Sequence, residues 1–278
     1  MIIDFHAHTF PKELAKRAIA KLSSGENLDP FSDGTNEGLI QSMDEAGVDI
    51  SVLLPVATKP EQAEGINKVA IENNRLYDGR LISFGGMHPD NDNYAKILTE
   101  LKAEGVKGIK LHPVFQKTNF DDIKYMRIVD KACELGMYVS VHAGYDITWP
   151  DADFVCAKRI EKLMQEVQPD KLILAHMGSW KKWDDAEELL AKYPTRIDTS
   201  FSLSPDGKDT FYDTDIHVLE KEQFRRIVRL VGADKVLFGT DSPWTSQQVS
   251  VDNIKNSGLN SEEIDMILGT NARDLLGI

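Results

Sequence analysis

The sequence alternates eight times between a short apolar run and a longer segment with helical or polar character. The apolar runs are Ile2–Phe5, Val48–Leu54, Leu81–Met87, Val106–Leu111, Met137–Val141, Lys171–Ala175, Arg196–Ser200 and Val236–Gly239. Most are rich in Val, Ile, Leu and Phe without polar alternation, as expected of parallel strands covered on both faces. Eight such strands predict an α/β fold, a (β/α)8 barrel of the TIM type, with residues 1–278 forming one domain.

The segments between the runs support this interpretation. Two of them place apolar residues at i, i+3, i+4 and i+7, which gives each predicted helix one apolar stripe; the residues are Tyr94, Ile97, Leu98 and Leu101, and Phe224, Ile227, Val228 and Val231. An open, doubly wound sheet has the same alternation and stays an alternative. Its dinucleotide-binding version is not supported, because no GxGxxG follows the first run.

Two connections are longer than the others. Ser23–Gly38 is rich in Gly, Ser, Asp and Asn, and we expect it to form a loop. Leu203–His217 follows the seventh run and contains Pro205-Asp206-Gly207. In a barrel this second connection would leave the rim where active sites are built, so it is interpreted either as a substrate-covering lid or as a solvated insertion.

The composition restricts the class of partner. The chain has 32 Lys and Arg against 45 Asp and Glu, a formal charge of −13. This charge argues against nucleic acid and against an anionic membrane surface, because both require a basic footprint. The two cysteines, Cys133 and Cys156, cannot form a disulfide framework, and no apolar run has the length of a spanning helix. We therefore expect a cytoplasmic protein whose partner is a small molecule.

Six of the seven histidines lie at or just beyond the C-terminal end of a predicted strand. They are His6, His8, His88, His112, His142 and His176. A single histidine on a strand is most often a hydrogen-bonded core residue. In a barrel, however, the C-terminal ends of the strands meet around the axis, so six imidazoles there would face one bowl.

The pair His6 and His8 is the most specific element of this set. Residues i and i+2 of a strand share a face, so both imidazoles can reach one cation at about 2.0–2.1 Å from nitrogen. Near the other end of the chain, the apolar run Val236–Gly239 is followed by Asp241. Asp241 is either a turn residue before Pro243 or a metal ligand. Its position at a strand end favours ligation, with a second role as a proton acceptor.

Together these motifs resemble the amidohydrolase superfamily, in particular the amidohydrolase-related branch that includes aminocarboxymuconate semialdehyde decarboxylase. The matching segments are Asp-Phe-His6-Ala-His8-Thr-Phe-Pro11, Gly-Ile-Lys110-Leu-His112-Pro, Val-His142-Ala-Gly, Ala-His176-Met-Gly, Phe-Gly-Thr-Asp241-Ser-Pro and Gly-Thr-Asn271-Ala-Arg-Asp-Leu-Leu-Gly. The resemblance spans the whole chain in the correct order. It implies a distorted barrel that binds a catalytic divalent metal, usually zinc.

The resemblance also implies roles for individual residues. His6, His8, His142 and Asp241 look like metal ligands, and His176 resembles the histidine that handles protons in single-metal members. Catalysis would then depend on His176 and Asp241. Lys110 and His112 share a strand face at i, i+2, and we assign them to substrate binding, because a lysine holds a substrate carboxylate as a point charge. Superfamily members with two metals instead use a carbamylated lysine as a bridge, so Lys110 with a second ion is the alternative to the preferred single zinc ion.

The function predicted from these observations is metal-dependent hydrolysis of a small, carboxylated substrate by a metal-activated hydroxide at the C-terminal rim of the barrel. The first alternative is non-oxidative decarboxylation, the reaction of the named relative. The second is a hydratase, or a metal-binding barrel without turnover. The resemblance is compatible with a homodimer, and the sequence does not specify the substrate.

Overall fold

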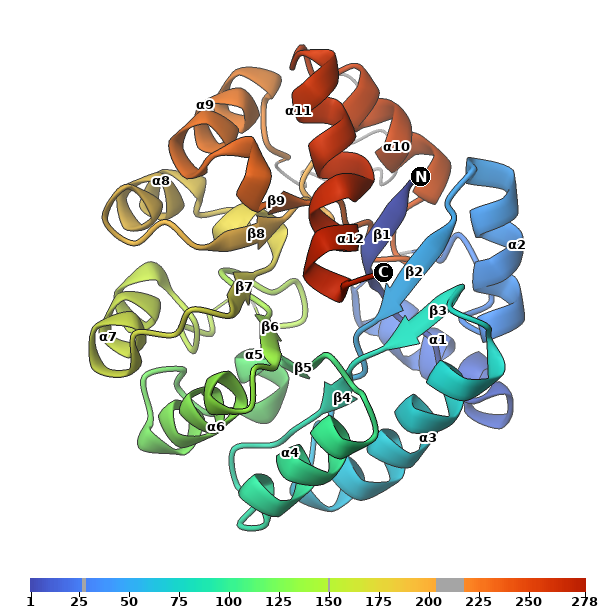
Figure 1. Cartoon of the computed structure of the whole chain (residues 1–278), viewed down its shortest axis with the longest axis vertical. Helices are drawn as coiled ribbons and strands as arrows, with labels where there is room; N and C mark the ends of the chain where they lie inside the picture. The colour runs from blue at the N-terminus through green and yellow to red at the C-terminus, as the bar shows by residue number, and fades with distance from the viewer. Residues whose placement is uncertain (27–28, 150, 204–217) are drawn as a thin grey trace. The chain divides into compact units, whose positions relative to one another are not determined.

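The computed structural model describes residues 1–26, 29–149, 151–203 and 218–278 (Figure 1). The chain divides into two compact units. Unit 1 consists of Met1–Leu53 and Asp198–Ile278, and unit 2 consists of Leu54–Ile197. The connection interpreted as a lid or an insertion falls on residues 204–217, which lie outside the described residues.

Unit 1 is built around strand β1. This strand, Ile3–Ala7, is buried at all five residues and pairs in parallel with β2, Ile50–Leu53. On its other side the Phe5 amide donates to the Phe238 carbonyl at 2.7 Å, directly after β9, Val236–Leu237. The helices of this unit are α1 (Lys12–Glu26), α2 (Asn36–Ala46), α9 (Lys221–Val231), η3 (Ala233–Lys235), α10 (Gln247–Lys255), α11 (Ser261–Asp265), η4 (Met266–Thr270) and α12 (Asn271–Leu276). The first and last predicted strands therefore lie side by side.

Unit 2 contains a row of parallel strands with helices along one side (Figure 1). The row consists of β4 (Gly85–Gly86), β5 (Gly108–Leu111), β6 (Tyr138–Val141), β7 (Leu172–Leu174) and β8 (Arg196–Asp198), which pair in sequence order. β3 (Leu81–Ser83) precedes this row, and the last residue of β8, Asp198, belongs to unit 1. The helices are η1 (Pro60–Gln62), α3 (Ala63–Leu76), α4 (Tyr94–Ala103), α5 (Pro113–Gln116), α6 (Ile123–Glu134), α7 (Ala157–Val167), η2 (His176–Gly178) and α8 (Trp183–Lys192). Because every pairing is parallel, all the C-terminal strand ends of this row point the same way.

All eight predicted strands are present. The third run is divided by Phe84 into β3 and β4. The predicted stripe on α9 is buried at Phe224, Ile227, Val228 and Val231. On α4 only Leu98 and Leu101 of the four predicted residues are fully buried.

The loop predicted over Ser23–Gly38 is wrong at both ends. Ser23 and Ser24 continue α1, and α2 begins at Asn36. Thr35 is the N-cap of α2, and its hydroxyl oxygen accepts from the Gly38 amide at 2.9 Å. The polar residues that suggested a loop therefore include the cap that starts a helix, because Thr, Asp and Asn are favoured both in turns and at N-caps.

Candidate metal centre

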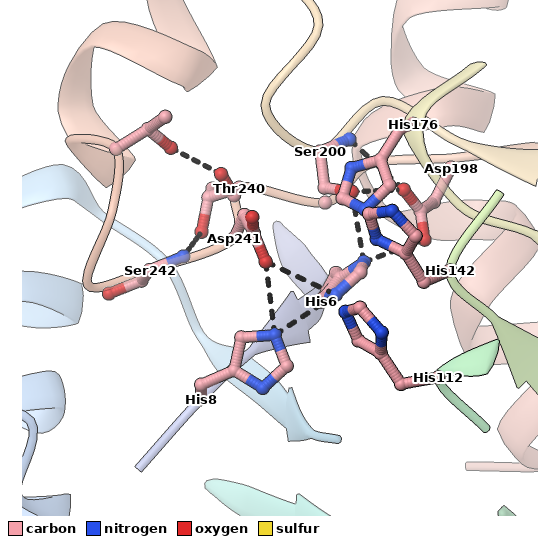
Figure 2. A network of polar contacts seen from close by, with 12 residues as sticks. His6, His8, His112, His142, His176, Asp198, Ser200, Thr240, Asp241 and Ser242 are labelled. Atoms are coloured by element: carbon pink, nitrogen blue, oxygen red, sulfur yellow. Dashed lines mark hydrogen bonds and ion pairs between the residues drawn. The ribbon is translucent and has the colours of Figure 1, made fainter. Parts of the chain in front are cut away.

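In unit 1 the side chains of His6, His8 and Asp241 converge at one point (Figure 2). His6 and His8 come from β1 and the residue after it, and Asp241 follows β9. His6 Nε2 lies 3.2 Å from His8 Nε2 and 3.3 Å from Asp241 Oδ1, and His8 Nε2 lies 3.0 Å from the same oxygen. Three of the four predicted metal ligands therefore lie together, although Asp241 is 233 residues away from His8.

These separations fit a bound metal ion. Four ligands placed tetrahedrally at about 2.0–2.1 Å from zinc are about 3.3–3.4 Å apart, so the three atoms have nearly the spacing of one face of a coordination tetrahedron. Two imidazole nitrogens and one carboxylate oxygen are ordinary ligands for a divalent first-row metal. His6 is fully buried and Asp241 is partly buried, so a cation there would be largely shielded from solvent.

Asp198, at the end of β8, orients His6. His6 Nδ1 donates to Asp198 Oδ2 at 2.9 Å, and both side chains are completely buried. The Ser200 hydroxyl donates to the other carboxylate oxygen and lies 2.9 Å from the same imidazole nitrogen (Figure 2). With its proton on Nδ1, His6 presents the lone pair of Nε2 toward His8 and Asp241, which is the usual arrangement behind a metal-bound histidine.

A buried carboxylate fixes the chain on which Asp241 stands. Asp4 accepts from the amide of Thr240 at 3.0 Å, from its hydroxyl at 2.6 Å and from Gln247 Nε2 at 2.7 Å. Burial raises the pKa of Asp4 to about 6, although these hydrogen bonds oppose the shift. Asp4 thereby joins the start of the histidine motif to the residue preceding Asp241.

Two residues with predicted chemical roles have left-handed backbone. Asp241 has φ of 69° and His176 has φ of 58°. Such values are uncommon outside glycine and cost about 1–2 kcal/mol, and strained residues of this kind concentrate at functional sites. The Asp241 amide donates to the His6 carbonyl at 2.7 Å, and Trp183 Nε1 donates to the His176 carbonyl at 3.1 Å, so both conformations are held by neighbouring groups.

In unit 2, His142 and His176 are hydrogen-bonded to each other. His176 Nε2 lies 3.0 Å from His142 Nδ1, and His142 Nε2 lies 3.0 Å from the Tyr145 carbonyl oxygen. Because a carbonyl only accepts, Nε2 of His142 carries the proton and Nδ1 holds the lone pair. The backbone carbonyl thus fixes the tautomer of His142, as Asp198 does for His6.

Among the described residues, a second group able to hold a metal consists of His112, His142 and Asp146. The rings of His112 and His142 are stacked, with centroids 4.2 Å apart and an angle of 15° between the planes. Lone pairs lie in the ring plane, so two nearly parallel rings cannot direct theirs at one ion about 2.1 Å away. Asp146 Oδ2 lies 3.8 Å from Nε2 of both rings. This group is a buried ring stack beside a carboxylate rather than a chelating site.

Lys110 and His88 complete the set of predicted residues. Lys110 on β5 is 1% exposed and is the register partner of Ser140 on β6. His88 follows β4, and its Nδ1 accepts from the Asp90 amide at 3.1 Å, which makes His88 part of a tight turn. Burial lowers the pKa of His88, with the charge of Asp90 opposing the shift.

The lowered pKa of His88 predicts a pH dependence of stability. The unfolded chain takes up this proton first as the pH falls below about 6.5, so the contribution of His88 is present above that pH and lost below it. His88→Asn keeps an acceptor for the Asp90 amide but does not titrate. Urea unfolding between pH 7 and pH 5 should show a steeper loss of unfolding free energy for the wild type than for the variant. Parallel curves would contradict this prediction.

Gly144 is required where the loops after β6 and β7 touch. Its φ is +90°, and a Cβ atom there would lie 2.3 Å from the Trp180 amide nitrogen. We expect Gly144→Ala to lower the unfolding free energy by about 2–4 kcal/mol, measured by urea denaturation. The matched control is Gly47→Ala, because Gly47 has φ of +69° but nothing within 4 Å of an added Cβ; it should cost about 1 kcal/mol. Equal losses would show that the close approach is unimportant.

Sequence reasoning missed Asp198, Ser200, Asp146 and Gln116 as residues that hold the histidines. Asp198 and Ser200 stand in the seventh predicted run, at the same strand end as the histidines. That position is a usable signal, because a barrel predicted from the sequence brings the C-terminal strand ends to one rim. Asp146 and Gln116 each lie four residues after a histidine, His142 and His112 respectively, but outside a recognised helix this spacing is not a specific signal.

A family model described as amidohydrolase matches residues 3–278. The chain belongs to the amidohydrolase family. The resemblance predicted from the sequence motifs is confirmed, since the match covers nearly the entire chain. No curated protein matches the sequence of this amidohydrolase.

Solved structures confirm the predicted fold class. This amidohydrolase is similar to an uncharacterised TIM-barrel protein from Bordetella bronchiseptica (TM-score 0.75, 15% identity, 99% of this chain and 98% of that chain). It is similar to 5-carboxyvanillate decarboxylase from Novosphingobium aromaticivorans, complexed with manganese and 4-hydroxy-3-methoxy-5-nitrobenzoic acid (TM-score 0.72, 13% identity, 100% of this chain and 96% of that chain). It is also similar to a probable 2-pyrone-4,6-dicarboxylic acid hydrolase from Acinetobacter baumannii with citric acid bound (TM-score 0.67, 18% identity, 100% of this chain and 99% of that chain). Within the described part of this amidohydrolase, no helix is both long and apolar enough to span a membrane.

Proposed function

We propose that this amidohydrolase is a divalent-metal-dependent hydrolase of a small carboxylated substrate. The observation that carries the proposal is the convergence of His6 Nε2, His8 Nε2 and Asp241 Oδ1 within 3.3 Å of one another. Asp198 supports it, because a metal-bound imidazole usually donates its other N–H to an acceptor such as a carboxylate, as His6 does to Asp198. Zinc is the proposed metal, and the manganese in the similar decarboxylase makes that ion the second choice.

His142 is the proposed fourth ligand. Its support comes from the motif Val-His142-Ala-Gly and from its fixed tautomer, with Nε2 donating to the Tyr145 carbonyl. Nδ1 holds the lone pair that accepts from His176 Nε2, and it would give up that hydrogen bond to bind the ion. A bound divalent ion would supply Lewis acidity and lower the pKa of a coordinated water. We propose one ion rather than two. The alternative, a second ion with a carbamylated Lys110, would add the mass of carbon dioxide to the intact protein.

The proposed proton carriers are His176 and Asp241. His176 Nε2 carries a proton, which it donates to His142 Nδ1. If His142 Nδ1 binds the ion, this N–H would be released from that hydrogen bond and His176 could donate to a leaving group as a general acid. Lys110 and His112 are the proposed substrate contacts. A lysine ammonium that is 1% exposed attracts a carboxylate strongly, because little water screens the pair.

Non-oxidative decarboxylation is the second candidate. The similarity to 5-carboxyvanillate decarboxylase over the full chain favours it. The same residues would serve this reaction. Lys110 would hold the carboxylate, and His176 would deliver a proton to the carbon atom from which the carboxylate leaves.

The test is a substrate panel with zinc-loaded and manganese-loaded protein. The panel contains lactones and amides that carry a carboxylate, and hydroxylated aromatic carboxylic acids. Ring opening or amide cleavage supports hydrolysis, and release of carbon dioxide supports decarboxylation. His176→Asn serves as the inactive control. If the wild type and His176→Asn were equally inert across the panel, an enzymatic function would be contradicted. Size-exclusion chromatography of the same samples tests whether the protein is a homodimer.

A further inference from the structure

Gln116, at the end of α5 in unit 2, makes four hydrogen bonds through one side-chain amide. Its Nε2 donates to the carbonyl oxygens of Ala57 at 2.7 Å and Met87 at 2.6 Å. Its Oε1 accepts from the His112 amide at 3.1 Å and from the Tyr125 hydroxyl at 2.7 Å. Both donors and both acceptor positions of the amide are therefore used, and the side chain is 4% exposed.

These bonds join three separate strand ends. Ala57 lies in the segment after β2, Met87 directly follows β4, and His112 directly follows β5. The orientation of the amide is fixed by its partners, since two carbonyl oxygens require N–H donors and a backbone amide requires an acceptor. Gln116 thus ties together, at one buried point, the segments that carry His112 and the turn of His88.

The first turn of α5, which Gln116 closes, determines which nitrogen of His112 carries the proton. His112 is the N-cap of α5, and its Nδ1 accepts from the Phe115 amide at 3.4 Å. The ring is packed between Phe115, with centroids 4.1 Å apart, and His142, at 4.2 Å. With Nδ1 as the acceptor, the neutral ring carries its proton on Nε2, which lies 3.8 Å from Asp146 Oδ2.

We propose that Gln116 is a positioning residue that holds His112 as a neutral donor, protonated at Nε2, for an oxygen atom of the substrate. This inference rests on the proposed function, because it deepens the role assigned to His112 in substrate binding. Gln116 acts through the main chain of His112 and does not touch the substrate. Its two N–H donors are essential, because a carboxylate in their place would face the carbonyls of Ala57 and Met87 without a proton between them.

The first test does not depend on activity. Nitrogen-15 NMR of histidine-labelled full-length protein, with His112 assigned by comparison with His112→Asn, reports the tautomer of each ring. The wild type should show His112 protonated at Nε2 alone at neutral pH. Gln116→Glu should lose this single tautomer, whereas Gln165→Glu should keep it. Gln165 is the matched control because its Nε2 also donates a hydrogen bond, to the Tyr193 hydroxyl, but on an exposed face of α7. Tyr125→Phe should also keep it, since three of the four bonds remain.

The second test uses a substrate found by the panel. Gln116→Glu should lower kcat/KM about 100-fold at pH 8, the cost of misplacing a substrate contact by about 1 Å. Activity should recover as the pH falls, because a protonated glutamate regains one donor, and Gln165→Glu should show no such pH-dependent recovery. A wild-type His112 protonated at Nδ1, or Gln116→Glu with an unchanged tautomer, would overturn the positioning role. An inert wild type with the expected tautomers would contradict the proposed function and leave the role of Gln116 supported.

Discussion

Replacing His6 or Asp241 by Ala is expected to empty the metal centre and abolish turnover, whereas replacing His176 is expected to keep the metal. Each of the first two substitutions removes one of three ligand atoms that lie 3.0–3.3 Å apart. His176 is hydrogen-bonded to His142 and is not one of these three ligands, so we expect its loss to remove a proton carrier rather than a ligand. A general acid or base typically contributes 10²–10⁴-fold, and we expect His176→Ala to lower kcat by about that factor.

Metal content after gel filtration, together with kcat, measures these outcomes. Asp241→Asn and His176→Asn are the matched variants, because asparagine tolerates the left-handed backbone of both positions better than alanine does. His8→Ala provides a further ligand deletion at a partly exposed residue. Full metal occupancy in His6→Ala and Asp241→Ala would refute the assigned centre.

Replacing Asp198 by Asn is expected to weaken metal binding by about 10–100-fold while leaving all the ligands in place. The neutral amide no longer favours the proton on His6 Nδ1, so Nε2 is less reliably available as a ligand. Residual occupancy at saturating metal should distinguish this variant from His6→Ala, which lacks the ligand altogether.

Competition with a chelator of known affinity measures the dissociation constant. Ser200→Ala is the control, because it removes the hydroxyl beside Asp198 and keeps the carboxylate on His6. Its effect on metal affinity should be clearly smaller. An unchanged metal dissociation constant in Asp198→Asn would contradict the role of the Asp198 carboxylate in orienting His6 for metal binding.

The fold could be predicted because its signal is local and repeated. Eight apolar runs without polar alternation indicate buried parallel strands wherever they occur. The errors lie where two structures share a residue preference: the polar segment before Asn36 contains a helix cap as well as a turn. The third run divides at Phe84, directly before Gly85 and Gly86, and glycines inside a strand pattern often mark such an irregularity.

The candidate site could be predicted only in part. The i, i+2 spacing of His6 and His8 predicts them as ligands, and the position of Asp241 after the last strand predicts it as a third. Asp198 and Gln116 act through contacts with residues far away in the chain, and Asp and Gln are common in many other roles. Which nitrogen of an imidazole is available depends on such partners, so tautomers follow from the folded structure and not from the motif.

The left-handed backbone at Asp241 and His176 limits how this protein can be re-engineered. Glycine, asparagine and aspartate accept such φ values readily, whereas most other side chains raise the energy of the folded chain. In a randomised library at either codon, many substitutions would add backbone strain of about 1–2 kcal/mol to their effect on the chemistry, so the two causes of lost activity would be mixed. Selection for a new reaction is better directed at neighbouring positions with ordinary backbone dihedral angles. There a substitution changes the side chain without adding backbone strain.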